Sequence, residues 1–149
     1  MARIKIDLPD DFNFSTTIPL RITDLNYGGH VGNDTVLSIV HEARIQFLRS
    51  FQYKELDFAG VSLIMSDAAL EFKAELFYGD SVIASVAADE FSNIGFDLYY
   101  KLEKVVEGKR VIVALAKTGM ICFDYDLRKV VRLPFGVQDK MLRAVNSLS

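Results

Sequence analysis

The order of the patterned segments constrains the fold more than any other feature of this sequence. One strongly amphipathic helical segment, at residues 34–52, precedes four long strand-like runs that only short turns separate. Strands joined by short turns pair antiparallel, and a lone amphipathic helix must bury its apolar side against the resulting sheet. This order predicts an α+β fold in which a long central helix is wrapped by a curved antiparallel sheet of about five strands.

The helical segment carries an apolar stripe that repeats every 3.6 residues, a period typical of an amphipathic helix. The stripe and its neighbours are Val36, Val40, Ala43, Phe47, Leu37 and Leu48. We expect Asn33 or Asp34 to cap the start of this helix by accepting a hydrogen bond from a free backbone N–H.

A first strand is expected at residues 16–23, at an edge of the sheet, because Pro19 has no N–H to donate to a neighbouring strand. The later strands and a short C-terminal helix are expected at residues 61–76, 81–91, 94–106, 109–125 and 135–146. Glu107 and Gly108 form a hairpin signal between the last two strands.

Composition narrows the functional classes. A chain of 149 residues predicts a single domain over residues 1–149, and a net charge of −3 argues against nucleic-acid binding. The sequence contains no uncharged apolar stretch of about 18 residues, so no membrane span is expected. Residues 1–11 lack the long apolar core of a signal peptide, so we expect a cytoplasmic protein. The single cysteine, Cys122, is interpreted as a buried bystander, and the two histidines do not form a zinc signature.

Three glycines lie in the loop at residues 24–34, directly before the helical segment. Glycine permits the tight turns and the close backbone approach that such a loop requires. The start of the following helix offers free N–H groups and the positive end of the helix dipole, which stabilise negative charge. The loop therefore marks a candidate site for an anion or a developing oxyanion.

Residues 21–33 read RITDLNYGGHVGN, residues 41–44 read HEAR, and residues 118–124 read TGMICFD, followed by RLP at residues 132–134. In this order and spacing, across residues 16–145, they resemble the hotdog-fold acyl-CoA thioesterases of the 4-hydroxybenzoyl-CoA thioesterase type. The resemblance implies hydrolysis of an acyl-CoA thioester to a free acid and coenzyme A. The long strands, and a last strand that is apolar on both faces, suggest a homodimer, which could pair into a dimer of dimers. Coenzyme A would enter as part of the substrate, with no separate cofactor and no metal.

The resemblance also implies site residues. In the family, the backbone N–H at the position of Asn33 polarises the thioester carbonyl, and the usual catalytic carboxylate falls at position 26, which here is Asn26. An amide cannot accept a proton from water as a carboxylate does. Asn26 is therefore expected to orient the water, and Asp24, His30 or Glu42 to activate it.

Each of these three residues also has a structural interpretation. Asp24 could cap the loop or pair with Arg21, His30 could be structural, and Glu42 could pair with Arg44 or Arg49. The residues expected to bind the substrate are Gly29, Val31, Phe47 and Met65, and the aromatic and apolar ones among them could instead be core.

The asparagine at position 26 leaves a second function open. In this alternative the chain binds an acyl-CoA or another acyl thioester without hydrolysing it. A hotdog hydratase is less supported, because no hydratase motif that pairs an Asp with a His is found.

Overall fold

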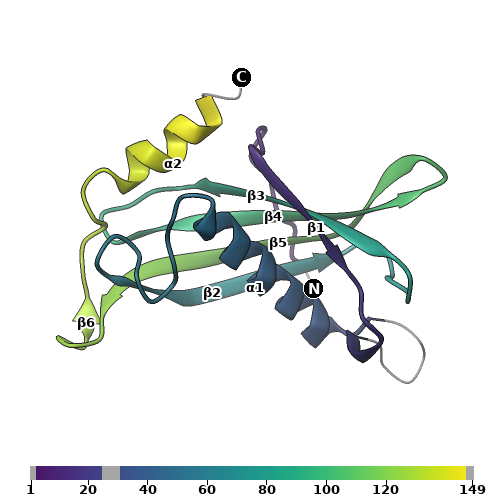
Figure 1. Cartoon of the computed structure of the whole chain (residues 1–149), viewed down its shortest axis with the longest axis horizontal. Helices are drawn as coiled ribbons and strands as arrows, with labels where there is room; N and C mark the ends of the chain where they lie inside the picture. Colours follow the sequence, from purple (N-terminus) through teal and green to yellow (C-terminus); the bar gives the residue numbers. More distant parts are fainter. Residues whose placement is uncertain (1–2, 25–30, 147–149) are drawn as a thin grey trace.

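The computed structural model describes residues 3–24 and 31–146, and it has the predicted α+β class (Figure 1). The elements in chain order are β1 (Phe14–Pro19), the 3-10 turn η1 (Ile22–Asp24), α1 (Asn33–Arg49), β2 (Ser62–Phe72), β3 (Ser81–Asp89), β4 (Gly95–Val106), β5 (Lys109–Asp124), β6 (Lys129–Val130) and α2 (Val137–Asn146). The predicted order of one strand, one helix, four long strands and a terminal helix is therefore confirmed.

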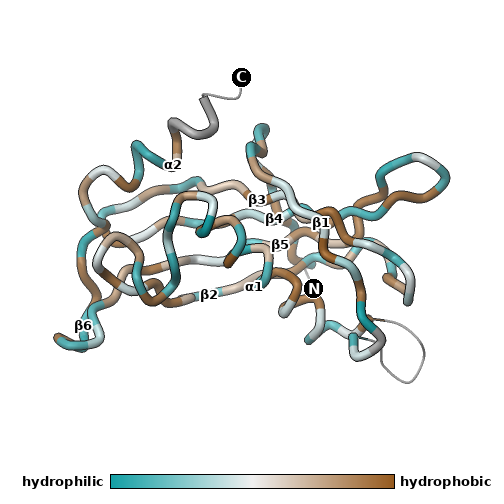
Figure 2. Tube along the Cα trace, in the orientation of Figure 1, coloured by the Kyte–Doolittle hydropathy of each residue, from teal (hydrophilic) through white to brown (hydrophobic). Residues whose placement is uncertain are grey.

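The strands form one antiparallel sheet in the order β1-β3-β4-β5-β2, and β6 pairs with β5. β1 lies at one edge, as Pro19 predicted, and β2 lies at the other. The sheet has six strands rather than about five, because the chain turns after β5 and Val130 pairs back with Phe123. The predicted hairpin is present, since Val106 pairs with Lys109, and Figure 2 shows its tip as hydrophilic.

The first strand is shorter than predicted. β1 ends at Pro19, and residues Ile22–Asp24 turn instead of remaining extended. The cause is local: the backbone N–H of Arg21 donates to the Asp24 carboxylate at 2.7 Å, and the Asp24 N–H donates to the Arg21 carbonyl at 2.9 Å. Asp24 is therefore not part of a strand that would place it on the same face as position 26.

α1 packs on one face of the sheet, along the diagonal seen in Figure 1. The predicted stripe is buried, and it shares one hydrophobic core with alternate side chains of β4, which are Phe96, Leu98, Tyr100 and Leu102. Leu37 differs, because its side chain is exposed. The predicted cap is wrong: the N-cap residue is Gly32, which has no side chain to accept a hydrogen bond, and Asn33 is already the first residue of the helix.

A polar network crosses the apolar interface between α1 and the sheet. The buried Arg44 guanidinium donates to Glu55 at 3.0 Å and to the Tyr100 hydroxyl at 3.3 Å. The Tyr100 hydroxyl also shares a 2.7 Å hydrogen bond with Thr118 of β5. Burial raises the pKa of the Tyr100 phenol, so it remains neutral in this network.

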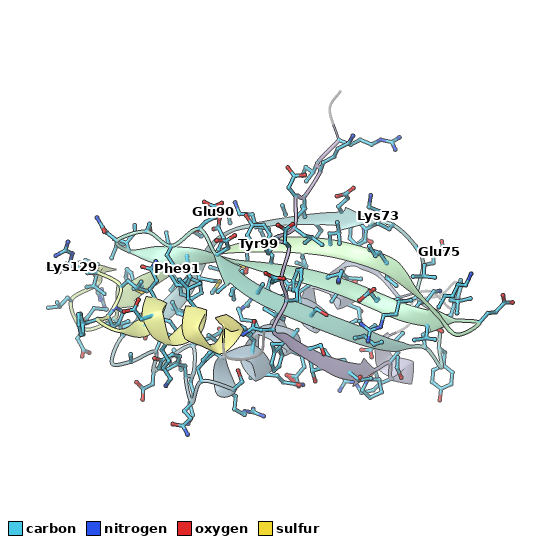
Figure 3. All side chains as sticks on the ribbon, turned by 90° about the horizontal axis from the view of Figure 1, so that it is seen from above. Lys73, Glu75, Glu90, Phe91, Tyr99 and Lys129 are labelled. Carbon is cyan, nitrogen blue, oxygen red and sulfur yellow. The ribbon has the colours of Figure 1, made fainter. Side chains whose placement is uncertain are left out.

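The N-terminal residues cross the other face of the sheet, which is opposite to α1 (Figure 3). The Ile6 N–H donates to Glu71 of β2 at 3.1 Å, and the Lys101 ammonium of β4 lies 5.1 Å from the centre of the Phe12 ring. A site at the start of α1 therefore lies on the face that the N-terminal segment does not cross.

Candidate functional site

The start of α1 is flanked by two cavities, one toward each edge of the sheet. The first, called here the β2-side cavity, has a volume of about 570 Å³ and is lined by Val31, Gly32, Asn33, Val36, Phe72, Ala74, Glu75, Leu76 and Val113. The second, called the β1-side cavity, has a volume of about 300 Å³ and is lined by Ile18, Pro19, Arg21, Asp24, Thr35, Ser38, Ile39 and Glu42.

The β2-side cavity contains the first turn of α1. The first N–H bonded within the helix is that of Val36, which donates to the Gly32 carbonyl at 3.1 Å. Residues 33–35 precede it in the first turn, where helix geometry leaves backbone N–H groups without a partner inside the helix. Asn33, the predicted carbonyl-polarising residue, therefore lies where a backbone N–H and the helix dipole can stabilise negative charge.

The opposite wall of this cavity is the segment that follows β2, and four hydrogen bonds hold its backbone. The N–H groups of Lys73 and Ala74 donate to the Val113 carbonyl at 2.8 and 3.1 Å. The Lys104 ammonium of β4 donates to the Glu75 carbonyl at 2.7 Å. The Val31 N–H donates to the Leu76 carbonyl at 3.1 Å, so this wall is tied directly to the start of the helix.

The β1-side cavity contains two of the predicted water-activating carboxylates. Asp24 accepts the Arg21 N–H at 2.7 Å, and one of its oxygens lies 3.5 Å from the Arg21 guanidinium. These contacts match the structural alternative for Asp24. Glu42 is exposed at the edge of the cavity, and Arg44, one of its suggested partners, bonds to Glu55 instead.

The three predicted substrate-binding residues that the structure describes do not gather in one place. Val31 lines the β2-side cavity, but Phe47 is buried in the core, where its ring meets those of Phe14 and Phe51 edge to face. Met65 is exposed on β2 and lines neither cavity. The predictions for Asn26, Gly29 and His30 fall on residues that lie outside the described part of the chain.

Sequence reasoning missed Glu75, which lines the β2-side cavity with Asn33. The predicted strand at residues 61–76 included it, so it resembled an ordinary polar strand residue. The available signal was the charge alternation Lys73-Ala74-Glu75 just before the turn at Gly79. That alternation also occurs on exposed strands, so it does not identify a site by itself.

Cys122 is buried among the apolar side chains of the core, and this burial raises the pKa of its thiol to about 11. The thiolate is the nucleophilic form, so the bystander interpretation agrees with this environment. Within residues 3–24 and 31–146, no three His, Cys, Asp or Glu side chains are grouped to hold a metal ion. No helix in the same ranges is long and apolar enough to cross a membrane.

A sequence profile of the thioesterase-like superfamily matches residues 20–144. The chain belongs to the thioesterase-like superfamily. A further sequence relative of this thioesterase-like chain is a 1,4-dihydroxy-2-naphthoyl-CoA hydrolase from Microcystis aeruginosa. It is 31% identical over 116 residues, which cover 76% of this chain and 81% of the relative.

Solved structures of thioesterases have the same fold. A 1,4-dihydroxy-2-naphthoyl-CoA thioesterase from Synechocystis superposes with a TM-score of 0.74 at 21% identity, over 91% of this chain and 96% of its own. An Asp-to-Asn mutant of 4-hydroxybenzoyl-CoA thioesterase, in complex with 4-hydroxybenzoyl-CoA, superposes with a TM-score of 0.78 at 12% identity, over 86% and 97%. The predicted hotdog fold is confirmed, and thioester hydrolysis is confirmed at the level of the family.

Proposed function

We propose that this thioesterase-like protein hydrolyses an acyl-CoA thioester to a free acid and coenzyme A in the β2-side cavity. The observation that carries the proposal is that the first turn of α1, with Gly32 as its N-cap residue, lines a cavity at Asn33. Attack on a thioester carbonyl places negative charge on its oxygen, and preorganised N–H groups stabilise that charge. The Asn33 N–H is the proposed donor.

The other walls of the cavity suit the acyl group. Apolar side chains come from the start of α1, from β2 and the segment that follows it, and from β5, and they are Val31, Val36, Phe72, Leu76 and Val113. A cavity of about 570 Å³ lies within the range of about 300–1,000 Å³ that is typical of small-molecule sites. The named relatives act on naphthoyl-CoA or bind benzoyl-CoA compounds, so we propose an aromatic acyl-CoA as the substrate class.

The working unit is proposed to be a homodimer of single hotdog domains, each spanning residues 1–149 with α1 as its central helix. β2 is an edge strand, and its segment Met65–Ala68 is exposed. Phe72, at the end of this edge strand, lines the β2-side cavity. A second copy that pairs with β2 would therefore contribute a further wall to the site, and two such pairs would give the dimer of dimers.

The asparagine at position 26 favours a second candidate function, which is binding of the acyl thioester without turnover. A chain that lacks the usual carboxylate can keep the carbonyl-polarising N–H groups and the acyl cavity. The solved complex of the Asp-to-Asn 4-hydroxybenzoyl-CoA thioesterase mutant supports this alternative, because that mutant is bound to 4-hydroxybenzoyl-CoA.

The test is release of free thiol from acyl-CoAs of graded chain length and from benzoyl-CoA and naphthoyl-CoA derivatives. Cys122 adds little background, because its buried thiol is shielded from the detecting reagent. We expect turnover, fastest with an aromatic acyl group. Thermal stabilisation by the same compounds without thiol release would refute hydrolysis and support binding without turnover. Absence of both responses would refute both functions.

A further inference from the structure

We propose that Glu75 is the catalytic carboxylate of this protein, and that it activates the water in place of the carboxylate absent at position 26. The inference rests on the proposed hydrolysis in the β2-side cavity, and it names the group that this reaction still lacks. Among the described residues, Glu75 combines a carboxylate oxygen with a position in that cavity.

The cavities separate the candidate carboxylates. Among the described residues that line the β2-side cavity, Glu75 alone carries a carboxylate. Asp24 and Glu42 line the β1-side cavity, which lies between α1 and the opposite edge of the sheet. An acyl carbonyl polarised by the Asn33 N–H is therefore on the same side of the helix as Glu75 and on the other side from Asp24 and Glu42.

The backbone at Glu75 is fixed on both sides. The Lys104 ammonium donates to the Glu75 carbonyl at 2.7 Å, and the carbonyl of the next residue, Leu76, accepts the Val31 N–H at 3.1 Å. Lys104 is itself positioned by Asp80, whose carboxylate lies 3.6 Å from the ammonium. The Glu75 side chain therefore starts from a backbone position that is fixed relative to the oxyanion donors, as catalysis of this kind requires.

Glu71, the carboxylate of β2 nearest to Glu75 in the sequence, is engaged elsewhere. Lys73, two residues before Glu75, pairs with Glu71 at 2.7 Å. Glu71 also accepts the Ile6 N–H from the segment that crosses the face opposite to α1, so it is occupied there. Figure 3 shows Lys73 and Glu75 at the same end of the sheet, far from Phe91 and Lys129 at the other end.

The step balances without a cofactor. The Glu75 carboxylate accepts a proton from water as the water oxygen bonds to the thioester carbon, and the carbonyl electron pair moves to the oxygen beside the Asn33 N–H. The tetrahedral intermediate collapses, the carbon–sulfur bond breaks, and the proton passes from Glu75 to the departing sulfur. The products are the free acid and the thiol of coenzyme A.

The test compares wild type with Glu75→Gln and with the control Glu107→Gln, which removes a carboxylate from the exposed β4–β5 hairpin. Each is assayed with the acyl-CoA that wild type hydrolyses fastest. We expect Glu75→Gln to lower kcat by at least about 100-fold, as for loss of a general base. KM should stay within about threefold, since uniform binding is unchanged. Glu107→Gln should match wild type.

Chemical rescue separates a catalytic role from a structural one. Formate added to Glu75→Ala should raise kcat by at least about tenfold, because it restores a carboxylate in the vacated space. It should leave Glu107→Ala unchanged. If wild type hydrolyses the substrate and the kcat of Glu75→Gln is within threefold of the wild-type kcat, the assignment of Glu75 is overturned. The assignment is also overturned if formate does not raise the kcat of Glu75→Ala. No turnover by wild type would instead overturn the proposed hydrolysis, and the assignment with it.

Discussion

Replacing Tyr100 with phenylalanine tests whether the buried polar network stabilises the docking of α1. The change removes one hydroxyl from a fully buried ring and leaves the shape of the side chain almost unchanged. Two partners lose a hydrogen bond: the Arg44 guanidinium at 3.3 Å and the Thr118 hydroxyl at 2.7 Å. The loss in the free energy of unfolding therefore comes from polar groups left without a partner, and not from a cavity.

The magnitude follows from the two bonds. A neutral hydrogen bond contributes about 1 kcal/mol to stability, and a bond to a charged group contributes about 1.5–3 kcal/mol. Arg44 keeps its bond to Glu55 at 3.0 Å, which limits its share. We expect Tyr100→Phe to lower the free energy of unfolding by about 2–3 kcal/mol, and to lower the Tm by about 8 °C for a chain of this size.

The assay is urea unfolding followed by circular dichroism, at a fixed protein concentration because association would shift the midpoint. Tyr99→Phe is the matched control, since Tyr99 is the neighbouring residue of β4 and its side chain lies on the other face of the strand. Its effect should stay below about 0.5 kcal/mol. If Tyr100→Phe is as stable as Tyr99→Phe, the network contributes nothing to stability and the reasoning fails.

Three further outcomes are expected. The Cys122 pKa is about 11 in the folded state and about 9 in the unfolded state, so the folded state retains the thiol proton. The free energy of unfolding should therefore fall by up to about 3 kcal/mol as pH rises from 9 to 11. Urea unfolding of Cys122→Ala over the same pH range should not show that decrease. Gly95→Ala should destabilise by at least about 2 kcal/mol in thermal unfolding, because its Cβ would collide with the backbone carbonyl of Met120; an unchanged Tm contradicts this. Asn26→Asp added to Glu75→Gln should recover kcat at least about tenfold; a double variant as slow as Glu75→Gln would show that position 26 cannot take over.

The sequence predicted the elements because their signals are local. The stripe that includes Val40 and Phe47 specifies a helix with one buried side, and the alternation through Leu98 and Tyr100 specifies a strand with one buried face. The errors lie at the ends of elements. Asp24 closes a turn through its own side chain, and Gly32 caps α1 through its backbone, so neither appears in the hydrophobic pattern.

The site was less predictable, because its walls come from segments that are distant in the sequence. Asn33 was predicted because the family resemblance assigns the carbonyl-polarising N–H to its position at the helix start, and it lines the β2-side cavity. Glu75 was missed because its position depends on Lys104, 29 residues away, and on the bond between Val31 and Leu76. Phe47 was assigned to the substrate because apolar residues of the core and of an acyl cavity have the same composition.

The two edges of the sheet differ in a way that limits how far copies of this chain can associate. β1 has six residues and ends in Pro19, which cannot donate to an added strand. β2 has eleven residues and no proline. A sheet with two open edges can add copies without end, as in a filament, whereas one open edge gives a two-fold contact that closes on itself. For the dimer proposed above, the short, proline-ended β1 therefore leaves β2 as the edge suited to pairing, which would give a finite assembly.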